Sequence, residues 1–84
     1  MSMNVSTDIV FRDGPAGRRP AVAGGPDVWE VVHVFIAEGG SVQATADNLR
    51  VSVGLVEAAI AYYTDNRAAI DEWIAANDAM MRVH

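Results

Sequence analysis

Apolar residues recur at two different spacings along this chain of 84 residues. Up to residue 23 they lie in short runs around turn-forming residues, whereas beyond residue 27 they recur every three or four positions. This change predicts a β-hairpin followed by helices. We expect a mainly α fold with a hairpin at 8–23 and a bundle of three or four helices at 27–84, as a single domain after a flexible segment at 1–7.

The hairpin is predicted from two short segments that flank a cluster of turn residues. Residues 8–12 read DIVFR, with Ile9 and Phe11 on one side of a strand. The sequence DGPAG at 13–17 is typical of a turn, and RRPAVA at 18–23 can return as the second strand.

Such a hairpin needs further contacts. Pro20 cannot donate a ladder hydrogen bond, so its strand is expected at an edge or at a bulge. A two-stranded hairpin is not stable by itself in water, so it must pack on the helices or pair with another copy. We expect Ile9, Phe11 and Val22 at a contact between two copies of the chain.

The first helix is expected to begin at Asp27 and to end at Gly39-Gly40. Asp27 with Glu30 three residues later has the spacing of a capping box. Its core-facing stripe comprises Val28, Val31, Val32, Phe35 and Ile36.

The next two helices have the spacing of a helix-turn-helix. Ser41 and Ser52 can cap them, and Arg50-Val51 forms the tight turn between them. Their inner faces comprise Val42, Ala46, Leu49, Val56, Ala59, Ile60 and Tyr63. Many three-helix bundles share this pattern. After an interruption at residues 64–66, a fourth helix is expected over 67–81.

Several short motifs occur together between Ile9 and Ile74. They are Pro20, Ala23-Gly24, Val28-Trp29, Gly40-Ser41-Val42, Ala46, Val56, Ala59-Ile60, Tyr62-Tyr63 and Ile70-Asp71. In this combination the chain resembles the small bacterial family catalogued as domain of unknown function four-three-three. It departs from that family at Gly24-Gly25-Pro26, where the family has Gly-Thr-Arg and thus a charged anchor.

The resemblance implies a homeodomain-like helix-turn-helix behind a β-hairpin, usually as a dimer. Members of that family are often proposed as antitoxins, VapB-like proteins that accompany a PIN-like nuclease toxin. The resemblance therefore implies a homodimer and a toxin partner for this chain.

Charge changes the expected role of the helix-turn-helix. Residues 1–26 hold three arginines against two acids, net +1, whereas residues 27–84 hold three arginines against nine acids, net −6. Nonspecific affinity for nucleic acids comes mainly from Lys and Arg, so this acidic chain is a poor general phosphate binder. The helix expected in the major groove begins with Ser52, Val53, Gly54, Leu55, Glu57 and Ala58, without Arg, Lys, Asn or Gln.

If DNA is bound, the candidate contacts are Arg18, Arg19, Arg50 and Ser52. The alternative for Arg18 and Arg19 is a solvated turn that keeps an edge strand from pairing wrongly. The candidates for a protein contact are Trp73, Met80 and Met81 on the fourth helix, since Trp and Met suit interfaces. The alternative for Trp73 is that it completes a small core, and Trp29 poses the same question.

We expect no enzyme, no cofactor and no metal. The chain has no cysteine, and His33 and His84 have no metal-binding spacing. Asp71 and Glu72 are adjacent and point about 100° apart on a helix, so they do not converge. No segment resembles a membrane span or a secretion signal, and we expect a cytoplasmic protein.

The function that the resemblance favours is that of an antitoxin which binds and inhibits a PIN-like nuclease, with autoregulatory DNA binding as a secondary role. The alternatives are a dimeric helix-turn-helix transcription regulator and a plain dimerisation module. A partner surface of net −6 would complement a basic, RNA-cleaving toxin.

Overall fold

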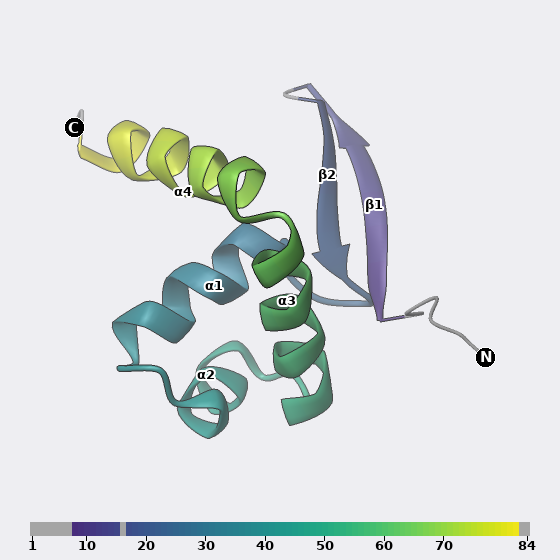
Figure 1. The fold of residues 1–84 in the computed structure, drawn as a ribbon, viewed down its shortest axis with the longest axis vertical. Coiled ribbons are helices and arrows are strands. Elements are labelled where there is room, and N and C mark those ends of the chain that lie inside the picture. Colours follow the sequence, from purple (N-terminus) through teal and green to yellow (C-terminus); the bar gives the residue numbers. More distant parts are fainter. Residues whose placement is uncertain (1–7, 16, 83–84) are drawn as a thin grey trace.

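The computed structural model describes residues 8–15 and 17–82, in which a β-hairpin precedes four helices (Figure 1). The elements are β1 (Ile9–Gly14), β2 (Gly17–Val22), α1 (Val28–Ala37), α2 (Val42–Leu49), α3 (Val53–Asp65) and α4 (Arg67–Arg82). The predicted fold class is confirmed. The flexible segment predicted at 1–7 lies outside the described residues.

The two strands pair antiparallel in one unbroken register, from Ile9 opposite Val22 to Gly14 opposite Gly17. The strands run further into the glycine-rich cluster than the sequence suggested, and leave only two residues for the turn.

The register explains how a strand of this hairpin tolerates Pro20. The Ala23 N–H donates to the Asp8 carbonyl oxygen at 2.8 Å, which marks these two residues as a hydrogen-bonded pair. Hydrogen-bonded and non-bonded pairs alternate along an antiparallel ladder, so Phe11 and Pro20 form a non-bonded pair. The nitrogen of Pro20 therefore faces away from β1, and its missing hydrogen costs no ladder bond. Of the two predicted explanations, the edge position is correct and no bulge is needed.

Helix α1 lies at the centre of the fold, with Val28, Val31 and Val32 fully or almost fully buried. The predicted stripe does not hold at its end, since Ile36 is 62% exposed. At 100° per residue, Ile36 lies about 80° around the helix from Val28 and leaves the buried face. The helix ends as expected, because Gly39 and Gly40 adopt φ values of 69° and 83° that favour glycine.

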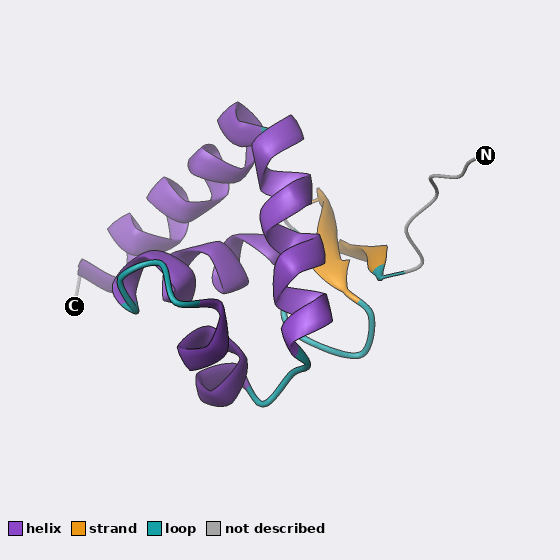
Figure 2. Ribbon diagram, turned by 60° about the horizontal axis from the view of Figure 1, so that its bottom comes forward, coloured by secondary structure: helices purple, strands orange, loops and turns teal. Residues whose placement is uncertain are grey.

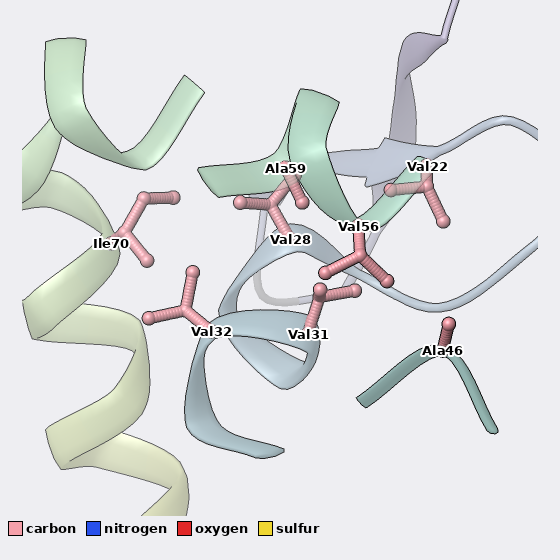
Figure 3. Packing of buried hydrophobic residues seen from close by; sticks show 8 residues of the cluster. All are labelled: Val22, Val28, Val31, Val32, Ala46, Val56, Ala59 and Ile70. Atoms are coloured by element: carbon pink, nitrogen blue, oxygen red, sulfur yellow. The ribbon is translucent and has the colours of Figure 1, made fainter. Parts of the chain in front are cut away.

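One core joins the hairpin to all four helices (Figure 3). Its buried apolar members are Val22, Val28, Val31, Val32, Ala46, Val56, Ala59 and Ile70. Thr45 is buried with them, and its hydroxyl donates to the Ser41 carbonyl oxygen at 2.7 Å. Because β2, α1, α2, α3 and α4 each contribute at least one side chain, this single cluster determines how the elements are arranged.

The hairpin stands at one side of the helices, with β2 next to them and β1 outermost (Figures 1 and 2). β2 contacts α1 and α3, and β1 contacts α3. Within the residues that the structure describes, no helix is both long and apolar enough to cross a bilayer.

Candidate functional site

The α2–turn–α3 unit has the capped geometry predicted from the sequence. The Ser41 hydroxyl accepts a hydrogen bond from Ala44 N–H at 3.0 Å, and the Ser52 hydroxyl accepts one from Leu55 N–H at 3.1 Å. Both serines therefore satisfy backbone donors that a helix start leaves unpaired. The helix-turn-helix is present as a structural unit, whatever it binds.

The turn depends on Arg50, which has φ 58° and ψ 44° and ends α2 in the left-handed conformation. The next N–H, that of Val51, donates to the Ala46 carbonyl oxygen at 3.1 Å. The Val51 side chain packs against the core, while the Arg50 side chain is exposed. A non-glycine residue in this conformation is uncommon and holds the turn at an energetic cost.

The first turns of α3 offer little to a DNA base. Val53 and Leu55 pack partly against the core, and the Ser52 oxygen already accepts the cap bond. The exposed groups that remain include the Glu57 carboxylate, which nearby phosphates would repel. The start of α3, residues 52–58, thus carries one carboxylate and no cationic side chain.

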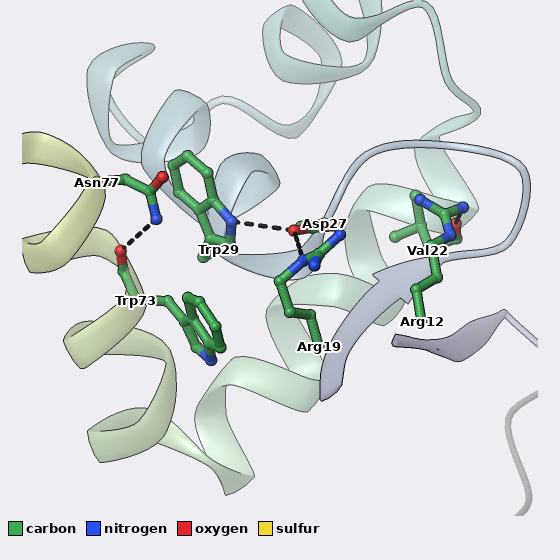
Figure 4. Close-up of polar contacts among 7 residues, drawn as sticks. All are labelled: Arg12, Arg19, Val22, Asp27, Trp29, Trp73 and Asn77. Carbon is green, nitrogen blue, oxygen red and sulfur yellow. Dashed lines mark hydrogen bonds and ion pairs between the residues drawn. The ribbon is translucent and has the colours of Figure 1, made fainter. Parts of the chain in front are cut away.

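Arg19, a predicted DNA contact, is engaged inside the molecule instead (Figure 4). Its Nε atom lies 2.6 Å from the Asp27 Oδ2 atom, and the side chains are 25% and 14% exposed. The same oxygen accepts a hydrogen bond from Trp29 Nε1 at 3.2 Å. The capping box predicted from Asp27 and Glu30 does not form: Asp27 is at the N-cap, yet its side chain makes no cap bond.

The other arginine candidates do not form one basic patch. Arg18, at the start of β2, lies over the Phe11 ring at 5.0 Å and is exposed. Arg50 is in the α2–α3 connection, and Figure 1 shows that connection at the opposite end of the molecule from the hairpin turn. A phosphate backbone could not contact both through a single compact basic site.

The two tryptophans come from α1 and α4 and lie on the same side of Asp27 and Arg19 in Figure 4. Both are half-buried, and Trp29 packs on the core cluster and tilts against His33 with 6.4 Å between ring centroids. Asn77 donates to the Trp73 carbonyl oxygen at 2.8 Å. The side chains of Met80 and Met81, the other predicted partner contacts, lie outside the described residues.

The three predicted dimer residues differ in their positions. Val22 is fully buried in the core of its own chain, so its assignment to a dimer surface is wrong. Ile9 is half-buried against the same core. Phe11 is 47% exposed, although its ring meets that of Tyr62 edge-on at 6.1 Å.

The structure shows a polar contact between α3 and α4 that the sequence did not predict. The Tyr63 hydroxyl donates to the Asp71 carboxylate at 2.7 Å, and the Arg67 guanidinium lies over the Tyr63 ring at 5.0 Å. The hydrogen bond raises the pKa of Tyr63 above its ordinary value of 10.0, with smaller contributions from burial and the Asp71 charge. Arg67 and Asp71 follow Tyr63 by four and eight residues, across the break between α3 and α4. The sequence does not give the angle between these two helices, so the spacing alone does not predict the contact.

No protein-family model matches this chain, and neither a curated protein nor a solved structure matches it. In the described parts of the chain, no group of three or more His, Cys, Asp or Glu side chains is arranged to hold a metal ion.

Proposed function

We propose that this chain binds a protein partner through the acidic surface of its helices, as the antitoxin of a VapBC-like pair. Its partner is then a PIN-like nuclease, and the antitoxin acts as a homodimer. The observation that carries the proposal is the exposure of the acidic residues on the helices. The exposed acids are Asp47, Glu57, Asp65, Asp71 and Glu72, on α2, α3 and α4.

The mechanism follows from charge complementarity. A nuclease that cleaves RNA needs cationic groups around its substrate, because phosphate contacts dominate affinity for nucleic acids. An acidic surface is attracted to those groups, speeds the encounter and, once docked, excludes the RNA. The resemblance described above supports the identity of the partner. The ion pair of Arg19 with Asp27 also supports a protein partner, since it removes one cation from the set available to DNA.

The test is co-expression with the product of the neighbouring gene, followed by co-purification and an RNA-cleavage assay. We expect a stable complex, inhibited cleavage and affinity that falls as salt is raised. The absence of a nuclease among the neighbours, or failure of the two proteins to co-purify, contradicts the antitoxin function.

A charge series at Glu57 sharpens the test, because that side chain is exposed on α3. Where Glu57 lies in the contact, Glu57→Lys should weaken the complex about tenfold and the matched neutral variant Glu57→Gln by less. The same Glu57→Lys change should strengthen any DNA binding, because it removes a repulsive charge. Opposite signs in the two assays therefore separate the two functions.

The second candidate function is a DNA-binding regulator, favoured by the capped α2–α3 unit and exposed Arg50. It predicts binding whose log–log slope against salt falls by about one unit in Arg50→Ala. Undetectable binding to DNA at about 50 mM salt, where phosphate contacts are strong, contradicts it.

A further inference from the structure

The outer edges of β1 and β2 differ in which backbone N–H and C=O groups they leave without a hydrogen-bond partner. On β2, the outward position at Pro20 has no N–H, and the outward N–H of Val22 donates to the Pro26 carbonyl oxygen at 2.9 Å. A bridge between Ala21 and Asp27 covers the same edge. Among the described residues, no strand pairs with the outer edge of β1. Hydrogen-bonded and non-bonded pairs alternate along the ladder. The N–H and C=O groups of β1 that point outward, away from β2, are therefore those of Ile9, Phe11 and Asp13.

The sequence along this open edge complements itself when it is read in the opposite direction. Residues 8–12 run Asp, Ile, Val, Phe, Arg, an acid and a base around three apolar residues. In an antiparallel pair of two copies centred on Val10, Asp8 of each copy faces Arg12 of the other, and Ile9 faces Phe11. Opposite charges and apolar pairs directly across an antiparallel pair each stabilise a sheet.

We propose that β1 pairs with β1 of a second copy in this register, about a two-fold axis at Val10. The two hairpins then form one four-stranded sheet with the order β2-β1-β1-β2. The register also suits the backbone, because it joins the outward N–H and C=O groups of Ile9 in one copy to those of Phe11 in the other. A two-fold axis normal to the sheet places both helical bodies on the same face, at opposite ends.

Neighbouring registers are unfavourable. A shift that centres the pair on Phe11 places Ile9 opposite the Asp13 carboxylate, and a shift that centres it on Arg12 places two guanidinium groups opposite each other. Like charges directly across a ladder destabilise it. Charged residues commonly keep edge strands apart, but the Val10 register matches Asp8 and Arg12 with a partner of opposite sign.

Two features of the single chain are accounted for by this pairing. Phe11, which is 47% exposed, gains Ile9 of the second copy as a neighbour on its own face of the sheet. Arg12 lies opposite Arg19 across the hairpin, and its side chain donates only to the Val22 carbonyl oxygen, at 3.3 Å, within the described residues. The Asp8 carboxylate of the second copy supplies the counter-charge that Arg12 lacks among those residues, while Arg19 already has Asp27.

This inference deepens the homodimer of the proposed function, and its test uses the full chain without any partner protein. We expect a dimer in sedimentation equilibrium. Asp8→Arg and Arg12→Asp should each weaken it about tenfold, because two facing charge pairs become repulsive. The double variant Asp8→Arg/Arg12→Asp should restore it, which loss of a contact within one chain would not do. The control Asp47→Arg makes the same change on α2 and should leave the dimer unchanged.

Amide hydrogen exchange tests the register without any substitution. The amides of Ile9 and Phe11 should be protected at concentrations that favour the dimer and exchange rapidly on dilution. The Val10 amide, which points toward β2, should stay protected throughout. A monomer at all concentrations, a double variant as weak as the single ones, or unprotected Ile9 and Phe11 amides in the dimer overturns the proposal. Each of these results leaves the binding of a nuclease to be decided by co-purification.

Discussion

At the residue scale, some charged side chains that the sequence predicts to lie at the surface instead stabilise the fold. The Asp27 carboxylate accepts hydrogen bonds from both Arg19 and Trp29, and so links β2 to the first turn of α1. An acid at this position also lies at the positive end of the α1 dipole. Arg19 is therefore a structural residue, and a variant that removes it would leave the half-buried Asp27 without its cation.

The Tyr63–Asp71 hydrogen bond leads to a prediction about pH. The folded chain favours the neutral phenol, so the pKa of Tyr63 is raised above 10.0. The stabilisation is present below pH 10.0 and is lost as the pH rises through the higher folded pKa. The chain has two tyrosines, so Tyr62→Phe leaves Tyr63 as the only phenol. Its absorbance titration at alkaline pH should have a midpoint above 10.0.

The matched control for that titration is Asp71→Asn in the same background. It removes the charge and weakens the hydrogen-bond acceptor, so the midpoint should move back toward 10.0. A midpoint that does not respond to Asp71→Asn would show that the hydrogen bond is not the cause of the shift.

At the element scale, the connection between α2 and α3 is short and strained at one residue. Arg50 adopts the left-handed conformation in which the side chain of an L-residue crowds its own backbone. This conformation turns the chain sharply enough for α3 to pack back on α2, with Ala46 and Val56 buried in the same core. The strain is thus tolerated because the core packing on both sides requires this turn.

The strain predicts that Arg50→Gly stabilises the protein, by about 1 kcal/mol, since glycine adopts positive φ without a steric penalty. Urea unfolding measures the change in the free energy of unfolding. Arg50→Ala is the matched control, because it removes the same charge and keeps a Cβ atom at φ 58°. Equal effects of the two variants would mean that charge and not backbone conformation determines the stability of the turn.

At the scale of the whole molecule, one small core joins every helix and β2. Most of its members are valine or alanine, and Ile70 is the largest of the fully buried side chains. Ile70 is also the residue by which α4 enters this core, since it comes from the first turns of that helix. A chain this small buries little apolar surface, so each such contact is a large part of its stability.

Ile70→Ala should therefore lower the free energy of unfolding by about 2–5 kcal/mol and detach α4 from the core. The same substitution at Ile36, which is 62% exposed, is the matched control and should change stability by less than about 0.5 kcal/mol. Urea unfolding of both variants tests this, and a similar loss at the two positions would contradict the placement of α4.

Local signals were sufficient for most of the secondary structure. Ser41, Ser52 and the Gly39-Gly40 pair act on backbone groups within a few residues of themselves, so their roles follow from spacing alone. The change from strand-like to helix-like spacing likewise placed the hairpin before the helices. By contrast, the burial predicted for Ile36 was wrong. Its burial depends on the angle at which α1 packs against its neighbours, which local spacing does not give.

The candidate site depended far more on contacts between distant residues. The sequence by itself determined the charge of the helices, the absence of basic groups at the start of α3 and the self-complementary segment at residues 8–12. Only the tertiary structure decided that Arg19 pairs with Asp27, that Val22 is buried and that the hairpin turn is far from the α2–α3 connection. The physical reason is that charge and periodicity are properties of neighbouring residues, whereas burial and ion pairing arise when folding brings separate elements together.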